Sequence, residues 1–192
     1  MNGELNYDEV WAMFQETDRR FKETAEQFKE TDRQFKETDK QFKATDRKLL
    51  KLERMFTGQW GKLIESLVEG DLVNLLNARG IPVNQTGQRI KKRYNKKDYE
   101  IDLIARNGKE VVFVEVKTTL KPDDVLNFTE KLKMAKTVFP EYSENILYGT
   151  VAYLRSESNA EQFAMKNGLL VIKATGKSAS IINDKEFLPA QF

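Results

Sequence analysis

Carboxylates and lysines are the side chains best able to do chemistry in this chain, because it contains no cysteine and no histidine. Asp102 lies in one alternating run, and Glu115 and Lys117 lie two residues apart at the end of the next. Side chains two apart in a strand share a face. Carboxylate oxygens are the ligands preferred by Mg²⁺ or Mn²⁺. The pattern predicts metal-assisted phosphodiester hydrolysis, with Asp102 and Glu115 as ligands and Lys117 orienting water or stabilising developing charge.

A charged pair at the end of a strand is most often only a solvated edge. Here Glu115 and Lys117 directly follow the apolar run Val111–Val114, which we expect to be buried on both faces. A buried carboxylate or ammonium is costly unless it is paired or bound to metal, which favours the functional interpretation. Glu100 should share the face of Asp102, either as an extra ligand or as a partner for Lys117.

The elements that must position these side chains follow from hydrophobic periodicity and turn residues. An amphipathic helix is expected at 60–79, where Gly58 interrupts the preceding heptads and Gly80 ends the pattern. Asn107-Gly108 predicts a hairpin turn. Strands are expected at 81–92, 99–105, 110–118, 146–154 and 169–174, helices at 123–139 and 159–167, and a short strand or edge cover in the tail, 178–192. This order predicts an α/β domain with a mixed sheet.

The spacing of Asp102, Glu115 and Lys117 resembles that of the PD-(D/E)XK nuclease superfamily. The stretch EIDLIARNGKEVVFVEVK is similar to archaeal Holliday-junction resolvases and to a small bacterial family of the same fold. The resemblance covers roughly residues 58–175. It implies a restriction-endonuclease-like core, a central mixed β-sheet flanked by helices, and a magnesium-dependent endonuclease. The residue before Asp102 is Ile101 rather than the proline of the motif.

The same resemblance implies a further metal ligand on the helix before the sheet. Such relatives carry a glutamate there, followed by a glycine about eleven residues later. Glu69 and Gly80 fit that spacing. Glu65 lies one turn earlier on the same helix face and could take its place. The choice between these two glutamates stays open at this point.

Residues 89–97, RIKKRYNKK, form a basic segment that we expect in the turn leading to the Asp102 strand. Its basic residues are Arg89, Lys91, Lys92, Arg93, Lys96 and Lys97. Positive charge beside the carboxylates would meet a phosphate backbone, so DNA is the expected partner. No base-reading motif is present, which favours recognition of shape and leaves branched DNA or RNA open. Lys131, Lys133 and Lys136 on the following helix could extend this patch, but a solvated helix face is the favoured expectation.

The N-terminal third is a heptad repeat. Apolar residues recur every seven positions, at Phe14, Phe21, Phe28, Phe35, Phe42 and Leu49. Threonines recur three positions later, so the two rows occupy the a and d positions of a coiled coil. Residues 1–57 are therefore predicted to assemble copies of the chain, and 58–192 to form the nuclease-like domain. Dimer, trimer and tetramer all stay open.

Charges flanking the apolar stripe favour a parallel arrangement. Acidic residues such as Asp32 and Asp39 recur at e, so antiparallel helices would set like charges together. The alternative is a solvated single helix held by intrahelical pairs such as Lys36 with Asp39.

Composition limits the remaining function classes. The net charge is +2, with 32 basic and 30 acidic residues, so only the distribution of charge can indicate a partner. No run approaches a membrane span and no secretory signal is visible, so we expect a cytoplasmic protein with no membrane partner. Gly176-Lys177-Ser178 lacks the glycine spacing of a P-loop, which excludes that route to nucleotide hydrolysis.

Two functions of different class fit these features. The first is an oligomeric, magnesium-dependent DNA endonuclease. The second is a catalytically inactive nuclease-fold protein, in which the coiled coil mediates assembly and the basic segment tethers DNA.

Overall fold

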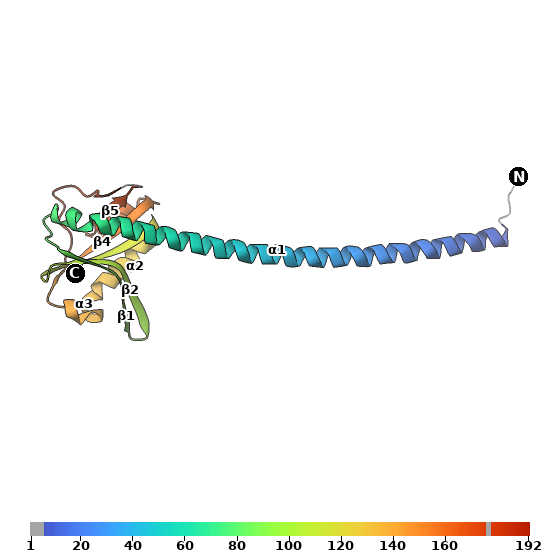
Figure 1. The fold of residues 1–192 in the computed structure, drawn as a ribbon, viewed down its shortest axis with the longest axis horizontal. Coiled ribbons are helices and arrows are strands. Elements are labelled where there is room, and N and C mark those ends of the chain that lie inside the picture. Colours follow the sequence, from blue (N-terminus) through green and yellow to red (C-terminus); the bar gives the residue numbers. More distant parts are fainter. Residues whose placement is uncertain (1–5, 176–177) are drawn as a thin grey trace. The chain divides into compact units, whose positions relative to one another are not determined.

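A computed structural model describes residues 6–175 and 178–192. The chain divides into two compact units, Met1–Arg54 and Met55–Phe192. The boundary expected from the sequence lies three residues later, after residue 57. Helix α1, Tyr7–Asn77, contributes residues to both units (Figure 1). It continues through Gly58, which interrupts the heptads without ending the helix. Gly176 and Lys177 of the rejected P-loop lie outside the described residues.

In the first unit the heptad stripe faces solvent. The five phenylalanines from Phe14 to Phe42 are between 66% and 72% exposed, and Leu49 is 58% exposed. The hydroxyls of Thr24 and Thr31 donate to backbone carbonyls four residues earlier. The threonines therefore satisfy their own hydroxyls and present a methyl group outward.

Intrahelical ion pairs follow the same repeat. Lys36 pairs with Asp32 at 2.5 Å and Lys43 with Asp39 at 2.6 Å. The expected pair of Lys36 with Asp39 is wrong, because each lysine reaches back one turn to the aspartate four residues before it. Within the described parts of the chain, no helix is long and apolar enough to cross a membrane.

The second unit is built on a six-stranded mixed sheet in the order β1-β2-β3-β4-β5-β6. The strands are β1 (Gln85–Tyr94), β2 (Lys97–Arg106), β3 (Glu110–Leu120), β4 (Ile146–Ser156), β5 (Leu170–Ala174) and β6 (Ala179–Ile181). The pairs β3–β4 and β4–β5 are parallel, and the other three are antiparallel. The connecting helices are α2 (Pro122–Lys133), α3 (Ala135–Val138), the 3₁₀ helix η1 (Pro140–Tyr142) and α4 (Ala160–Lys166).

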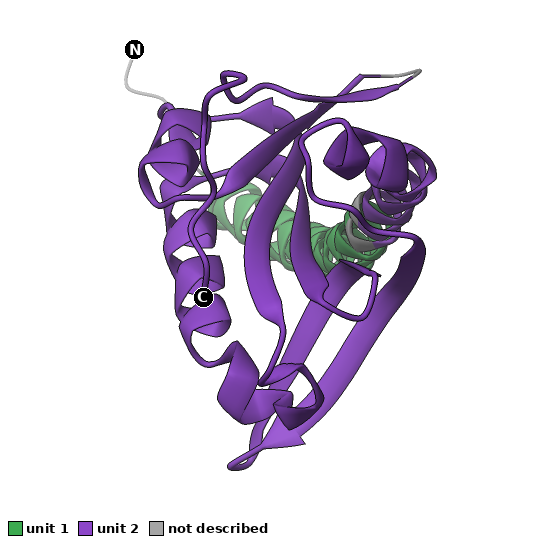
Figure 2. Cartoon of the chain, turned by 90° about the vertical axis from the view of Figure 1, so that its left-hand side faces the viewer, with its two compact units in different colours: residues 1–54 green, residues 55–192 purple. Residues whose placement is uncertain are grey.

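Helices cover both faces of this sheet (Figure 2). Ile64, Val68, Leu72 and Leu76 of α1 pack with Val112 and its neighbours on one face. On the other face, α2 contributes Val125, Phe128 and Leu132, which pack around Phe113. Residues Val111–Val114 of β3 are all at most 1% exposed, as expected for a strand buried on both faces. The predicted α/β architecture, a central mixed β-sheet flanked by helices and preceded by a long helix, is confirmed.

Two glycines set backbone geometry near the site. Gly108 follows Asn107 with φ 93° and closes the hairpin between β2 and β3. Gly149 of β4 lies under α2, where an added Cβ would be 2.3 Å from Leu132 Cδ1 and 2.7 Å from Leu169 Cδ2. The missing side chain lets α2 lie close to the sheet.

Candidate active site

Asp102 lies where β2 separates from β3 and where its pairing with β1 is interrupted by one residue. Pairing with β1 passes from Leu103 to Ile101 and omits Asp102, and pairing with β3 stops at Leu103. The Asp102 carboxylate accepts the backbone N–H of Val116 at 2.7 Å. This side chain therefore replaces the lost ladder hydrogen bond and holds the two strands at the point where they diverge.

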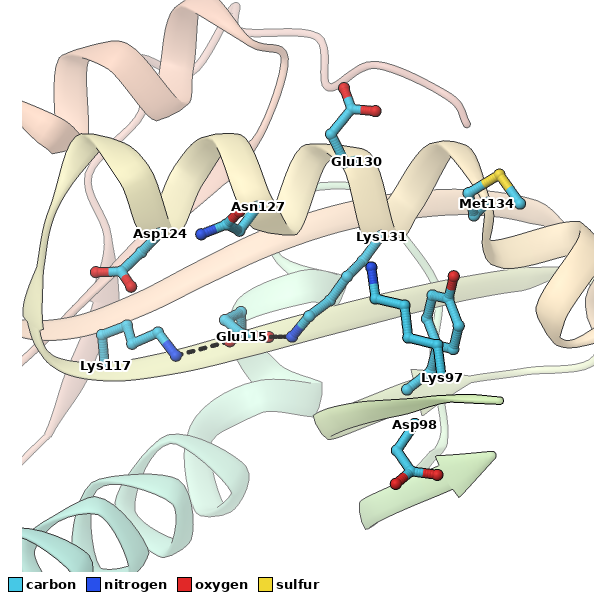
Figure 3. A pocket seen from close by; sticks show the side chains of 10 residues that line it. Lys97, Asp98, Glu115, Lys117, Asp124, Asn127, Glu130, Lys131 and Met134 are labelled. Atoms are coloured by element: carbon cyan, nitrogen blue, oxygen red, sulfur yellow. Dashed lines mark hydrogen bonds and ion pairs between the residues drawn. The ribbon is translucent and has the colours of Figure 1, made fainter. Parts of the chain in front are cut away.

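Glu115 is the buried acid of the site. It is 6% exposed, and each carboxylate oxygen accepts from an ammonium group. Lys117 Nζ lies 2.7 Å from Oε1, and Lys131 Nζ lies 2.8 Å from Oε2 (Figure 3). The prediction that Lys131 belongs to a solvated face is wrong, because α2 turns this residue toward the sheet. Its neighbour Lys133 does face solvent and pairs with Glu130.

The pKa values of Asp102 and Lys117 are both raised, but for different reasons. Burial, and then the negative charge of Glu115, raise the pKa of Asp102 from 3.8 to about 6, although the Val116 N–H opposes this. Burial lowers the pKa of Lys117, but the charges of Glu115 and Asp102 outweigh it and the net shift is upward. Lys117 therefore keeps its proton, while Asp102 carries a charge that another cation would stabilise.

The two helix glutamates are distinguished by their partners. Glu65 pairs with Arg89 at 3.1 Å, and its charge also raises the pKa of Asp102. Glu69 accepts hydrogen bonds from Thr86, at 3.2 Å, and from Gln88. Glu65 is therefore the helix carboxylate whose charge affects the pKa of Asp102, whereas Glu69 is hydrogen-bonded to the start of β1.

Arg89 reaches Glu65 through an unusual backbone conformation. Its φ is 51°, in the left-handed region that a non-glycine residue adopts at a cost. It is also the β1 residue that the ladder omits opposite Asp102. Strain of this kind is concentrated at functional sites, and here it directs the guanidinium toward the helix.

Most of the basic segment forms part of strand β1 and not the expected turn. The turn consists of Asn95 and Lys96, both with positive φ. Along the strand, basic residues alternate in direction and meet acids: Lys91 pairs with Glu100, Arg93 with Asp98, and Lys92 with Glu141. Glu100 is thus a cross-strand partner of Lys91 and not of Lys117. Among the described residues, Lys96 and Lys97 form no ion pair.

A cavity of about 540 Å³ opens between the hairpin, β3 and α2. Glu115 and Lys117 line it from the sheet, Asn127 and Lys131 from α2, and Lys97 and Tyr99 from β2 (Figure 3). Lys97 Nζ lies 5.5 Å from the centre of the Tyr99 ring, a cation–π contact. Besides Glu115, three further acids line the cavity, Asp98, Asp124 and Glu130, so Glu115 borders a groove of mixed charge.

The donor set suits a hard cation, although it is not assembled as a metal cage. Among the described residues, no group of three or more acidic side chains lies close enough to hold an ion. Asp102, Glu115 and Glu65 are all oxygen donors, as Mg²⁺ and Mn²⁺ require. The oxygen donors are of the type that such an ion prefers, and they would surround it only after Lys131 or Arg89 moved away.

Sequence reasoning missed Lys131, the Arg89–Glu65 pair and the groove residues Tyr99 and Asn127. The lysine could have been found only from the phase of α2 relative to the sheet. A non-glycine residue with positive φ inside a strand has no sequence signal.

Comparison with known proteins places these residues in context. The uncharacterised protein family UPF0102 matches residues 73–155. That range contains Asp102, Glu115 and Lys131 and excludes Glu65 and Glu69. No curated protein matches the chain.

Several solved structures resemble part of the chain. A repair endonuclease from Pyrococcus abyssi is 19% identical, with a TM-score of 0.39 over 55% of this chain and 46% of that one. EndoMS in a complex with double-stranded DNA is 13% identical, with a TM-score of 0.34 over 60% and 46%. A protein of unknown function is 14% identical, with a TM-score of 0.37 over 52% and 53%. This chain spans about half the length of these structures. The family model covers less than half of this chain.

Proposed function

We propose that the second unit is a metal-dependent endonuclease that hydrolyses DNA phosphodiester bonds, and that the heptad segment of α1 joins copies of it in a parallel coiled coil. One observation carries the proposal. Asp102 and Glu115 flank the point where β2 and β3 separate, and Lys117 contacts the buried Glu115 at 2.7 Å. A buried acid flanked by ammonium groups in a groove is expected where a charged substrate is processed.

Each residue has a role that follows from its position. Asp102 and Glu115 would hold Mg²⁺ or Mn²⁺, with Glu65 as the helix ligand in preference to Glu69. A bound cation would supply a water of lowered pKa and stabilise charge on the phosphate. Lys117, held by Glu115, directs an ammonium toward the groove and can donate to a phosphate oxygen or to the attacking water.

The hairpin supplies the contacts to the nucleic-acid backbone. Lys96 lies at its turn and Lys97 lines the groove beside Glu115. Lys91, Lys92 and Arg93 are paired with single acids on neighbouring elements, so they contribute less free positive charge. Contacts of this kind bind phosphates without reading bases, which suits recognition of DNA structure.

Cleavage assays test this function directly. Supercoiled plasmid, single-stranded DNA and a four-way junction would be incubated with Mg²⁺ or Mn²⁺ and the wild type, Asp102→Asn or Asp123→Asn. Asp123 is an exposed aspartate at the start of α2 and serves as the matched control. We expect cleavage by the wild type and Asp123→Asn, and none by Asp102→Asn. Equal cleavage by all three would assign the activity to a contaminant.

A second function has its own supporting observation. Glu65 and Glu115 are already neutralised by Arg89 and by two lysines without any metal. This arrangement is also stable as a purely structural network, as expected of an inactive DNA-binding scaffold. DNA binding by the wild type with no cleavage of any of the three substrates would favour the scaffold.

The oligomer is supported by the exposed apolar stripe of the first unit. A row of phenylalanines each at least 66% exposed is unusual unless another surface covers it. Light scattering of the full chain tests this, and a monomer at micromolar concentration would contradict it.

The parallel orientation of the helices is tested with Phe14→Cys, since the chain has no natural cysteine. A disulfide-linked dimer under oxidising conditions supports the parallel arrangement, which brings identical positions together.

A further inference from the structure

We propose that Lys131 is a positioning residue with two places in the site. In the free protein its ammonium occupies the oxygen of Glu115 that a divalent cation would take, and with DNA bound it moves to a backbone phosphate. This inference rests on the proposed function, because it concerns the same groove and the same carboxylate.

Both oxygens of Glu115 are occupied by ammonium groups. Lys117 holds Oε1 at 2.7 Å and Lys131 holds Oε2 at 2.8 Å. Glu115 is only 6% exposed, so little of its carboxylate is open to solvent. A cation that took either of these two positions would have to displace the lysine that holds it.

Lys131 is the lysine that leaves more easily. Lys117 is attracted by Asp102 and Asp124 as well as by Glu115. Lys131 has Glu115 and, at 3.4 Å, the backbone oxygen of Glu100, which is a weak contact. Its side chain hangs from α2 above the groove, and its exposure of 31% is about the same as the 32% of Lys117 (Figure 3). A flexible four-carbon stem lets the ammonium move without any change in the helix.

The charges of the site explain what draws Lys131 away. Asp102, Glu115 and Asp124 carry three negative charges against the two positive charges of Lys117 and Lys131, so a bound divalent cation would leave this group with an excess of one positive charge. A DNA phosphate in the groove offers Lys131 a new partner and cancels part of that excess. Cation and DNA should therefore bind cooperatively, each increasing the affinity for the other by the same factor.

The test uses the full chain and compares wild type, Lys131→Met, Lys131→Arg and Lys133→Met. Methionine keeps the apolar stem and removes the charge. Lys133 lies on the same helix, pairs with Glu130 and is 59% exposed, so it is the matched control. Mn²⁺ affinity is measured by calorimetry without DNA. Affinity for a labelled DNA duplex is measured by fluorescence anisotropy with Ca²⁺ present.

The expected changes are opposite in sign. Lys131→Met should bind Mn²⁺ about tenfold more tightly than wild type, and bind DNA about fivefold more weakly. Lys131→Arg and Lys133→Met should stay close to wild type in both assays. A merely structural role for Lys131 would weaken both affinities together, and that result would overturn the inference.

The outcomes separate this inference from the nuclease proposal. If wild type cleaves DNA and Lys131→Met binds Mn²⁺ no more tightly, the positioning role falls and the nuclease stands. If no protein cleaves but Lys131→Met gains Mn²⁺ affinity, the positioning role stands and the nuclease falls. If no protein binds Mn²⁺, both are overturned.

Discussion

Two glutamates, one in each unit, are each held by two cationic side chains. Glu16 in the first unit accepts from Arg19 and Arg20, both at 2.9 Å at their shortest. Glu115 in the second unit accepts from Lys117 and Lys131 at 2.7 and 2.8 Å. The side chain of Glu16 is 42% exposed and that of Glu115 is 8% exposed. The contacts are alike, and the surroundings differ.

Burial decides what such a contact can do. Hydrogen bonds from Arg19 and Arg20 lower the pKa of Glu16 to about 2, yet water and salt screen a charge on an open helix. At Glu115 the sheet and α2 leave little room for water, so charges interact strongly. The negative charge of Glu115 accordingly helps to raise the pKa of Asp102. Repeated exposed pairs keep α1 helical and soluble, while one buried pair can prepare a reactive site.

The largest effect should come from neutralising each glutamate in turn. Glu115→Gln removes a proposed ligand and leaves two half-buried lysines without their counter-charge. We expect cleavage to fall roughly 10³-fold and the free energy of unfolding to fall by about 1–3 kcal/mol. Glu16→Gln should change neither quantity measurably. Cleavage rates and urea unfolding of both variants check this, and equal effects at the two sites would remove the distinction drawn from burial.

The next largest effect concerns the apolar stripe of the first unit. Phe28→Ser with Phe35→Ser removes two proposed layers, each contributing about 1.5–3 kcal/mol per buried ring. We expect the oligomer to dissociate at micromolar concentration, while near-ultraviolet circular dichroism of the second unit is unchanged. Lys29→Ser with Lys36→Ser alters neighbouring helix positions outside the stripe and is the control. An unchanged mass for the phenylalanine variant in light scattering would show that the stripe is not the interface.

A smaller effect, with a definite pH dependence, is expected at Asp102. Its pKa is raised from 3.8 to about 6, so the folded protein binds this proton more tightly than the unfolded chain. Stability in the absence of metal should therefore fall as pH rises from about 4 to about 6, and stay constant above that. Asp102→Asn removes this dependence and should be more stable at pH 8, by on the order of 1–3 kcal/mol.

Unfolding curves of wild type and Asp102→Asn, recorded from pH 4 to 8 with a chelator, measure the difference. The curves should converge near pH 4. Adding Mg²⁺ should stabilise the wild type and leave Asp102→Asn unchanged, because only the former keeps the proposed ligand. A variant less stable than wild type at pH 8 would show that the Asp102 charge is well solvated.

The geometry of the central site was accessible from sequence because local rules set it. Asn107-Gly108 fixes a hairpin, and the hairpin brings Asp102 and Glu115 to the same end of its ladder, next to the last pair, Leu103 with Val114. Alternation along β3 then puts Glu115 and Lys117 on one face. The buried run Val111–Val114 was equally visible, because burial on both faces requires continuous apolar residues.

The parts that escaped prediction depend on contacts between distant segments. Lys131 occupies a charged helix turn like that of Lys133, and only the packing of α2 on the sheet separates their directions. The basic run was expected as a turn because strands rarely hold so many lysines. Opposite-charge partners across the hairpin, such as Glu100 for Lys91, make a strand possible there.

The smallest expected effect concerns the threonine row, which either packs between helices of the coiled coil or faces water. Thr24 and Thr31 donate their hydroxyls to their own helix, so Thr24→Val with Thr31→Val costs one weak hydrogen bond at each position. Valine and threonine have similar helix propensities, so an isolated solvated helix should hardly change. In a buried d layer, each added methyl group should stabilise the oligomer by up to about 0.8 kcal/mol. Thermal unfolding at several concentrations measures this. A higher and concentration-dependent unfolding midpoint would show that the threonines pack between helices. An unchanged midpoint would indicate that α1 is a single helix, with its threonines, like the ion pairs of Glu16, exposed to water.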